Sequence, residues 1–331
     1  MSASERLVAA GEELPVISEP TAMFHDLASK VPKLEIFLKK MSHRPLRVAT
    51  MCSGTESPLL ALDKIADATE KLFGSRLNVE HVFSCEIEPF KQAYIERNFS
   101  PPILFRDIRE LKEKQAYTAY GALVDVPGKV DILVAGTSCV DYSNLNNEQK
   151  GLNEQGESGQ TFRGMKAWIM RCKPPVVILE NVCGAPWQQI VDDFASFGYT
   201  ADFLRLDTKR YYIPHTRTRV YLFATKIAPV KGEKAPKPGE DYTCAVYRKR
   251  VRTLSGYKDK KTKKNHEGTL TKQWKDKVKE LERPASSTLE AFLFDSDDPR
   301  VHKGRQMLAR PGEDGTRAGT DWARCACRPR P

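Results

Sequence analysis

"VDILVAGTSCVDYSNLNN", residues 130–147, is the segment from which the architecture of this chain can be worked out. Its first half is a run of apolar and β-branched residues, which is the composition of a buried strand. The chain then passes through Gly136 into a turn rich in Ser, Asp and Asn, and it places a single cysteine, Cys139, at the start of that turn. The rest of the sequence indicates which residues are expected to lie near this thiol.

Strand-like runs of the same kind recur along the chain and alternate with helical patterns. This alternation predicts an α/β fold, with a doubly wound, mostly parallel sheet and no internal repeat. Ligands of such sheets bind at the carboxyl ends of the strands. The expected strands are LRVATM (46–51), VEHVFSCE (79–86), VDILVAG (130–136), PPVVILEN (174–181), TADFLRLD (200–207) and RVYLFAT (219–225), and the expected helices include Pro89 to Asn98, Thr161 to Cys172 and Trp187 to Phe197.

The 331 residues suffice for one large α/β domain and a smaller appendage. One helix is expected before the first strand, at about Phe24 to Lys40. The stretch APVKGEKAPKPGEDY, residues 228–242, ends the alternation and is typical of a linker. We expect four regions: a lead-in (1–44), the α/β domain (45–228), an incomplete basic C-terminal region (229–310) and a tail without helical or strand periodicity (311–331) that is disordered.

The formal net charge of +10 is concentrated in one part of the chain. Residues 226–283 hold 18 Lys and Arg against 8 Asp and Glu, so the remaining residues are balanced. Such a segment is either a solvated Lys-rich loop or a surface that contacts phosphate groups, and composition alone favours neither.

Several classes of protein are disfavoured by composition. No apolar run is long enough to span a membrane, and the N-terminus lacks the layout of a signal peptide. The eight cysteines are scattered, which suits a reducing compartment better than a disulfide framework. Cys325 and Cys327 are close neighbours, but without a second pair nearby they make a poor zinc signature, so no metal is expected.

The first expected strand ends in MCSGTES, residues 51–57. Gly54 in a turn between strand and helix allows the backbone to approach a ligand, and the helix N-terminus offers free N–H groups. An ordinary βα turn has the same composition, so this signal is weak on its own. Glu56 would repel a phosphate, which argues against a pyrophosphate ligand.

Two carboxylates follow the next two strands. Glu86 lies at the tip of one strand, where an acidic residue commonly binds ribose hydroxyls, and Asp107 at the tip of the next could accept a hydrogen bond from an adenine amino group. Roles at helix N-termini are the alternative for both. A glycine turn with two such carboxylates suggests a nucleoside without phosphates, and S-adenosylmethionine is a ligand of that kind.

Cys139 shares the same sheet edge with an acid and two arginines. Glu180 ends the strand PPVVILEN, and Arg217 and Arg219 enter the last strand at alternate positions, so both point to one face. Taken singly, an inert buried cysteine and surface arginines are the commoner interpretations. Taken together, a thiolate could add to an electron-poor ring carbon, a carboxylic acid could protonate a ring nitrogen, and arginine could bind a ring carbonyl.

The order of these motifs resembles the DNA (cytosine-5) methyltransferases over about residues 46–225, in a divergent class found in fungi and other microbial eukaryotes that is often fused to a SNF2-type ATPase. That family has a Rossmann-like class I methyltransferase fold. The motifs are MCSGTES (51–57), SCEIEP (84–89), RDIREL (106–111), GTSCVDYSNLN (136–146), GESGQTFRGM (156–165), ILENV (178–182) and IPHTRTRVYLFA (213–224).

The resemblance implies a role for each site residue. Cys139 would attack C6 of a cytosine flipped out of double-stranded DNA, Glu180 would contact its N3 and amino edge, and Arg219 with Arg217 would contact its carbonyl. Residues 141–159 would form a lid over that base, the basic region would be a partial target-recognition region, and the protein would be nuclear. The expected cofactor contacts are Cys52, Gly54 and Thr55 at the methionine end, Glu86 at the ribose, and Ile87, Asp107 and Ile108 around the adenine.

The sequence also departs from the family's usual pattern. Val140 stands where the family has a Gln thought to help hold DNA, Glu56 and Ser57 replace two glycines of the cofactor turn, and His215 replaces a Gln. A Gly-Asn-Ser/Ala-Val-like segment that completes the cofactor pocket is missing near the C-terminus, so a truncated enzyme is expected. Two alternatives remain open: a catalytically inactive nucleic-acid-binding or assembly module, and an RNA (tRNA) cytosine-5 methyltransferase. A nicotinamide dehydrogenase is disfavoured by the glycine spacing.

Overall fold

The computed structural model describes residues 14–143, 146–227, 253–254, 256–258, 265–311 and 317–320. The expected linker, most of the basic segment and the pair Cys325 and Cys327 lie outside the described residues. Within the described part of the chain, no helix is both long and apolar enough to cross a membrane. No group of His, Cys, Asp or Glu side chains in that part is arranged to hold a metal ion.

A seven-stranded sheet forms the centre of the fold, in the order β3-β2-β1-β6-β7-β9-β8. β1 is parallel to β2 and β6, and β9 runs antiparallel between β7 and β8, so the predicted doubly wound, mostly parallel sheet is confirmed. The strands are β1 (Leu46–Met51), β2 (Val79–Cys85), β3 (Leu104–Phe105), β6 (Ile132–Ala135), β7 (Val176–Asn181), β8 (Tyr199–Asp207) and β9 (Thr218–Lys226).

The strand order reverses between β1 and β6, and this reversal places the site. From β1 the chain moves outward to β2 and β3, and from β6 it moves outward in the opposite direction. At such a reversal the loops that follow the two strands diverge to opposite faces and leave a crevice at their carboxyl ends. The two loops here are the glycine turn after β1 and the Cys139 turn after β6.

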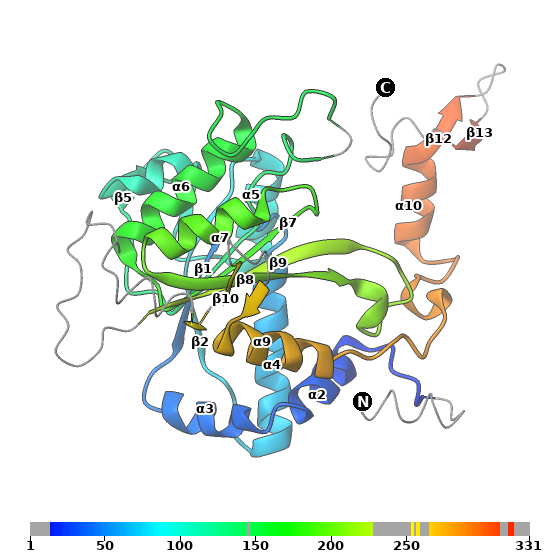
Figure 1. Ribbon diagram of the computed structural model, residues 1–331. Coiled ribbons are helices and arrows are strands. Elements are labelled where there is room, and N and C mark those ends of the chain that lie inside the picture. Colours follow the sequence, from blue (N-terminus) through cyan, green and yellow to red (C-terminus); the bar gives the residue numbers. More distant parts are fainter. Residues whose placement is uncertain are drawn as a thin grey trace.

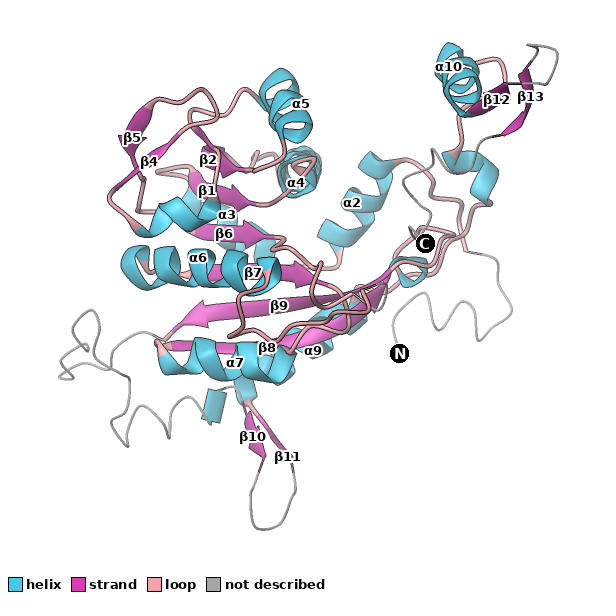
Figure 2. Ribbon diagram, turned by 90° about the horizontal axis from the view of Figure 1, so that it is seen from above, coloured by secondary structure: helices cyan, strands magenta, loops and turns pink. Residues whose placement is uncertain are grey.

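Helices cover both faces of the sheet (Figures 1 and 2). On one face Trp168 packs edge-on against Phe83, with ring centroids 5.6 Å apart. On the other face Trp274 stacks on Phe223 at 5.3 Å. The helices that flank the sheet are α4 (Ser57–Phe73), α5 (Pro89–Phe99), α6 (Glu157–Cys172), α7 (Trp187–Ser196) and α9 (Thr269–Glu280).

The expected single helix at Phe24 to Lys40 is wrong, because the structure has two helices there. These are α2 (Pro20–Ser29) and α3 (Lys33–Met41). Pro32 lies between them, and a proline lacks the N–H donor and disfavours helical backbone in the preceding residue. Both helices pack against α4, and Leu38 of α3 is buried in a small cluster beside the first strand. The lead-in is therefore part of the packed structure.

The tail also departs from expectation, because part of it is regular. β12 (Ala309–Pro311) and β13 (Arg317–Thr320) pair antiparallel. A pair this short is held by backbone hydrogen bonds and does not require alternating apolar and polar side chains. The sequence therefore carries no strand pattern there. The remaining short elements are η1 (Ile108–Lys112), β4 (Gln115–Tyr117), β5 (Leu123–Asp125), η2 (Thr208–Arg210), β10 (Gly256–Lys258), β11 (Asn265–Glu267), η3 (Leu289–Phe292) and α10 (Pro299–Leu308).

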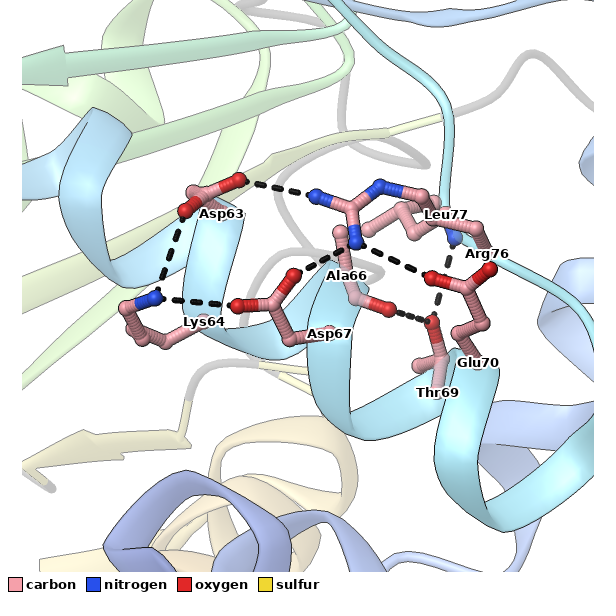
Figure 3. A network of polar contacts seen from close by, with 8 residues as sticks. All are labelled: Asp63, Lys64, Ala66, Asp67, Thr69, Glu70, Arg76 and Leu77. Carbon is pink, nitrogen blue, oxygen red and sulfur yellow. Dashed lines mark hydrogen bonds and ion pairs between the residues drawn. The ribbon is translucent and has the colours of Figure 1, made fainter. Parts of the chain in front are cut away.

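A network of charges fixes the end of α4 to the loop that enters β2 (Figure 3). Arg76 donates hydrogen bonds to Asp67 and Glu70 through one terminal nitrogen and to Asp63 through the other, at 2.5, 3.2 and 2.9 Å. Lys64 adds an ion pair with Asp67 at 2.9 Å. The network lies at the amino edge of the sheet, on the side away from the Cys139 turn. Exposed pairs of this kind contribute little to stability individually.

Candidate active site

The Cys139 turn begins where β6 is tied to β1. The N–H of Gly136 donates to the carbonyl of Met51 at 3.0 Å, which holds the start of the turn beside the end of the first strand. The carbonyl of Cys139 accepts hydrogen bonds from the N–H groups of Tyr142 and Ser143, both at 3.0 Å. These bonds close one helical turn around the thiol. The Cys139 side chain is half-buried, which suits a thiol that must meet a ligand.

A reciprocal pair of hydrogen bonds fastens this turn to the start of α6. The N–H of Ser158 donates to Asp141 Oδ2 at 2.7 Å, and the N–H of Asp141 donates to Ser158 Oγ at 3.0 Å. A Cβ atom on Gly156 would lie 2.2 Å from the same carboxylate oxygen, so the approach requires glycine. Asp141 is buried and satisfies one of the free N–H groups at the helix N-terminus, that of Ser158. We call this pair of residues the Asp141–Ser158 clasp.

The acid and one arginine of the site form an ion pair across neighbouring strands. Arg219 Nε lies 3.2 Å from Glu180 Oε1. Burial raises the pKa of Glu180 above its ordinary value, and the positive charges of Arg219 and Arg217 oppose part of that rise. A carboxyl group with a raised pKa holds its proton at higher pH, which is required of a proton donor. Of the two arginines expected beside Glu180, Arg219 contacts it, whereas Arg217 acts on it through its charge alone.

The end of β7 is joined to the Cys139 turn through Asn181. Its Nδ2 donates to the carbonyl of Thr137 at 2.9 Å and to the Thr137 hydroxyl at 3.2 Å. On the neighbouring residue, Glu180 Oε2 lies 3.7 Å from where a Cβ on Gly136 would be. The acid therefore lies beside the segment that carries the thiol, while the tightest contact of such a Cβ would be with the Cys52 carbonyl, at 3.1 Å.

The loop between β8 and β9, residues 208–217, positions the arginines and is called the arginine loop below. Thr208 closes its base, because the Thr208 hydroxyl donates to the carbonyl of His215 and accepts from the N–H of Arg217 at 3.1 Å. Asp207 accepts from the Thr218 hydroxyl at 3.0 Å, which fixes the start of β9. Arg217 itself is exposed at the end of the loop.

The turn after β1 is fastened to the tip of β2 by a carboxylate. Glu86 accepts from the N–H of Gly54 through Oε2 at 3.1 Å, and from the N–H groups of Ile87 and Glu88 through Oε1 at 3.0 and 3.2 Å. Gly54 adopts φ +65°, which glycine reaches without strain. Burial and the carboxylates of Glu86 and Asp107 raise the pKa of Cys52 to about 12, so this thiol stays neutral. The predicted cofactor residues Cys52, Gly54, Glu86 and Asp107 therefore share one region.

The remaining predicted cofactor residues differ in their availability. Ile87 is 52% exposed beside Glu86, so its side chain is free to pack on a planar ligand. Thr55 lies in the turn, and its hydroxyl is within hydrogen-bonding distance of Ser57 Oγ at 3.1 Å. Asp107 caps η1 by accepting from the N–H of Arg109 at 2.8 Å, and it also binds the Arg109 guanidinium. Ile108, in contrast, is packed in the main hydrophobic core.

Glu56 does not occupy the position that its sequence suggested. Its carboxylate is buried beneath the turn, where Oε1 accepts from the hydroxyls of Thr50 and Ser84 at 2.8 and 2.6 Å. The expected repulsion of a phosphate by Glu56 therefore does not follow from the structure, because the group is directed between β1 and β2. Ser53 Oγ, in the same turn, is buried without a hydrogen-bond partner among the described residues. An unpaired hydroxyl in this turn fits a site that binds a polar ligand.

The model of the C-5 cytosine-specific DNA methylase family matches residues 47–307. The chain belongs to this family. A methylase described as DNA (cytosine-5-)-methyltransferase DMT5, from Cryptococcus neoformans var. grubii, is 53% identical over 320 residues, which cover 96% of this chain and 12% of that protein. The protein with the same description from Verticillium dahliae is 35% identical over 228 residues, covering 54% of this chain and 10% of that protein. The chain thus spans a small part of the length of both relatives.

A solved structure of a methyltransferase from Entamoeba histolytica, EhMeth, aligns with a TM-score of 0.41 and 14% identity. The alignment covers 60% of this chain and 57% of that one. The assignment of this methylase to its family does not depend on that likeness.

Sequence reasoning missed two features of the methylase site. The expected start of α6 at Thr161 is wrong, because the helix begins at Glu157 and its cap comes from Asp141 in the preceding loop. The Asn181 bridge to Thr137 was also missed, although the strand ending "EN" marks a polar residue at the carboxyl edge. Both contacts are tertiary, so the sequence can mark a polar residue but not the partner that it binds.

Proposed function

We propose that this chain is the catalytic domain of a DNA cytosine-5 methyltransferase that uses S-adenosylmethionine. One observation carries the proposal: the Cys139 turn and the Glu86-tethered glycine turn follow the two strands of the reversal, and the Glu180–Arg219 pair lies next to them at the end of β7, which Asn181 joins to Thr137. Catalytic residues at the carboxyl ends of neighbouring strands fit a reaction that needs two ligands side by side.

The residues divide the chemistry among them. Cys139 Sγ bonds to C6 of a cytosine turned out of the duplex, while Glu180 gives or shares its proton at N3 and Arg219 binds the ring carbonyl. These contacts shift electron density to C5, which becomes the nucleophile. Bound S-adenosylmethionine supplies an electrophilic methyl group on sulfur. Loss of the C5 proton to a base then breaks the bond between C6 and Sγ and restores the thiolate.

The cofactor fits the groups that the turn presents. Glu86 still has lone pairs to accept from two ribose hydroxyls, and the exposed Ile87 side chain can pack on an adenine ring. The N–H groups of the turn and the Ser53 hydroxyl can bind the polar end of the methionine moiety. Asp107 would accept from the adenine amino group with the oxygen lone pairs that Arg109 leaves available.

The proposal also covers the substrate, the cellular location and the partners of the methylase. The basic residues of segment 226–283 would contact the phosphates of double-stranded DNA. A DNA substrate implies a nuclear location in a eukaryotic cell. The match covers 12% of the relative from Cryptococcus neoformans var. grubii. As partners of the methylase domain we propose a SNF2-type ATPase or another chromatin factor.

Covalent trapping tests the reaction directly. The protein is incubated with S-adenosylmethionine and a duplex containing 5-fluorocytosine, in which fluorine replaces the proton that must leave, so the enzyme–DNA bond persists. We expect a denaturation-resistant complex for the parent chain and for Cys183→Ala, which removes an exposed thiol three residues after Glu180 in the sequence. Cys139→Ala should form none. A complex formed by Cys139→Ala, or no complex with the parent, would overturn the proposal.

The two alternatives give different outcomes in the same assay. An inactive nucleic-acid-binding or assembly module would bind duplex DNA without taking up labelled S-adenosylmethionine. An RNA methyltransferase would form its complex with tRNA containing 5-fluorocytosine, and unlabelled tRNA would compete better than unlabelled duplex.

A further inference from the structure

Three segments that are far apart in the sequence meet at one tyrosine of the arginine loop. The Tyr212 hydroxyl donates to Asp26 Oδ2 in α2, and the N–H of Tyr212 donates to the carbonyl of Arg283 at 2.8 Å. Arg283 in turn donates through its own N–H to the carbonyl of Arg210, also at 2.8 Å. The lead-in, the arginine loop and the segment after α9 are therefore bound to one another at this point.

The guanidinium of Arg283 is the centre of the junction. It is 4% exposed, its Nη2 donates to the carbonyl of Pro15 at 2.6 Å, and its Nη1 donates to Ser286 Oγ at 3.0 Å. Its carbon lies 5.4 Å from the centre of the Tyr212 ring, and its Nε lies 3.9 Å from Asp26 Oδ2. A buried guanidinium requires an opposite charge, and Asp26 provides it.

The electrostatics of Asp26 agree with that role. Burial alone would raise the pKa of Asp26, but hydrogen bonds from Lys30 and Tyr212, with the charges of Lys30 and Arg283, lower it below its ordinary value. Asp26 is thus held ionised between Lys30, whose Nζ is 2.8 Å away, and Arg283. A carboxylate fixed by three partners from three segments is more than a surface ion pair.

Tyr212 itself adopts an unusual backbone conformation. Its φ of +67° is in the left-handed region, which a bulky residue adopts only when its surroundings hold it there. The ring is buried, and the residue lies in the same loop as Arg217, whose N–H bonds Thr208 at the loop base. The junction and the Thr208 contacts are therefore two separate restraints on the loop that leads into β9.

We propose that Asp26, Tyr212 and Arg283 are positioning residues, which hold the arginine loop so that Arg217 and Arg219 meet the base and Glu180. In this proposal α2, which precedes the sheet in the chain, contributes to the geometry of the methyl-transfer site. This inference rests on the proposed function, since it assigns a purpose to the geometry of that site. None of the three residues need touch the substrate.

The junction also concerns the basic segment. The chain leaves the sheet at the end of β9, Lys226, and returns through α9 to Arg283. Trp274 stacks on Phe223, and Lys275 pairs with Asp202, so α9 is docked on β9 and β8 before the chain reaches the junction. In Figure 1 the end of α9 approaches α2. The return of the basic segment is thus anchored to the loop that positions the arginines.

Hydrogen exchange in the free protein tests the restraint without requiring activity. In Tyr212→Phe, which keeps the ring and removes only the hydroxyl, we expect the amides of residues 208–217 to exchange about tenfold faster, the size expected for losing one charge-assisted hydrogen bond. Asp26→Asn should act in the same direction and more strongly. Asp67→Asn is the matched control, because it removes an ion-paired aspartate from the network of Figure 3 and should leave the loop unchanged.

Single-turnover kinetics test the purpose. In Tyr212→Phe we expect the rate of covalent complex formation with 5-fluorocytosine DNA to fall about tenfold, while the KM for S-adenosylmethionine stays at the parent value. A KM for S-adenosylmethionine that rises as much as the rate of complex formation falls would overturn the inference, and so would unchanged amide exchange of residues 208–217. If the parent chain forms no complex, the proposed function fails, and the exchange experiment still decides whether the junction restrains the loop.

Discussion

The Nε atom of Arg219 lies 3.2 Å from Oε1 of Glu180, and this ion pair joins β9 to β7 at the carboxyl edge of the sheet. Glu180 faces Tyr221 across the strand pair, so Arg219 reaches it diagonally from two residues earlier on the same face. Two opposing effects determine the pKa of Glu180: burial favours the neutral form of the carboxyl group and raises the pKa, and Arg219 favours the ionised form and lowers it.

Replacing Arg219 should change the pH dependence of the reaction. Arg219→Gln removes a charge that lowers the pKa of Glu180, so this pKa rises further. We expect the maximal rate to fall by about tenfold. We also expect the decline of the rate at alkaline pH to begin at a higher pH than in the parent, because Glu180 keeps its proton to higher pH. Single-turnover rates across a pH series measure both effects.

The same variant makes a prediction about stability. A carboxyl group whose pKa is raised by folding favours the folded state while protonated, and this stability is lost as pH rises from about 4.3, its value in an unfolded chain, through the folded value. In Arg219→Gln the loss of folding stability with rising pH should be larger and should extend to higher pH. Urea unfolding across the series measures it. Arg205→Gln on β8 removes an equal charge from an exposed arginine, and an identical pH profile there would contradict the assignment to Glu180.

The Asp141–Ser158 clasp should be needed for a well-positioned thiol. Asp141→Ala removes the acceptor of the Ser158 N–H at the start of α6, so we expect the free energy of unfolding to fall by about 1–2 kcal/mol, as for loss of a helix cap. The rate of complex formation with 5-fluorocytosine DNA should fall as well, because the Cys139 turn loses its attachment. Thermal or urea unfolding and single-turnover kinetics provide the two measurements.

A glycine variant tests the closeness of that contact. Gly156→Ala would place a Cβ 2.2 Å from Asp141 Oδ2, so the clasp must open and the variant should behave like Asp141→Ala. Gly304→Ala in α10 has open space around the added methyl group and serves as the control, with stability unchanged or raised by up to about 1 kcal/mol. Equal behaviour of the two glycine variants would contradict the role of the clasp.

Glu86 should govern the affinity for S-adenosylmethionine. Glu86→Gln keeps the size of the side chain but removes the negative charge that accepts from the N–H groups of Gly54, Ile87 and Glu88. We expect Kd for the cofactor to rise by about 10- to 100-fold, the range for loss of hydrogen bonds to a charged group. Titration calorimetry measures it. Glu88→Gln, on the exposed neighbour, should bind like the parent, and an equal loss there would exclude a specific role for Glu86.

The sequence predicted those parts of the fold that have a local signal. Apolar runs ended by polar residues located the main strands, and β1 coincides with the predicted run Leu46–Met51. Because the carboxyl ends of parallel strands share one edge, the sequence predicted that Gly54, Glu86 and Glu180 lie at that edge.

The features that were missed depend on contacts between distant residues. Tyr212 bonds Asp26 over a separation of 186 residues, and no period or motif in the sequence records that pairing. Glu56 was misplaced for a related reason: the sequence puts it in the turn, but the hydroxyls of Thr50 and Ser84 draw its carboxylate beneath the sheet edge. Tertiary hydrogen bonds decided both positions.

Val140 offers a final prediction, because it departs from the glutamine that the family usually has after the nucleophile. Its side chain is 51% exposed beside Cys139, so it adds an apolar surface where DNA is proposed to lie. Val140→Gln introduces one acceptor and two donors at that position. We expect Kd for duplex DNA to fall by about two- to tenfold, the gain from one net hydrogen bond. Val140→Ala, which also removes the branched side chain but adds no polar group, should not tighten binding, and an equal gain in both variants would assign the effect to lost bulk instead of a new contact.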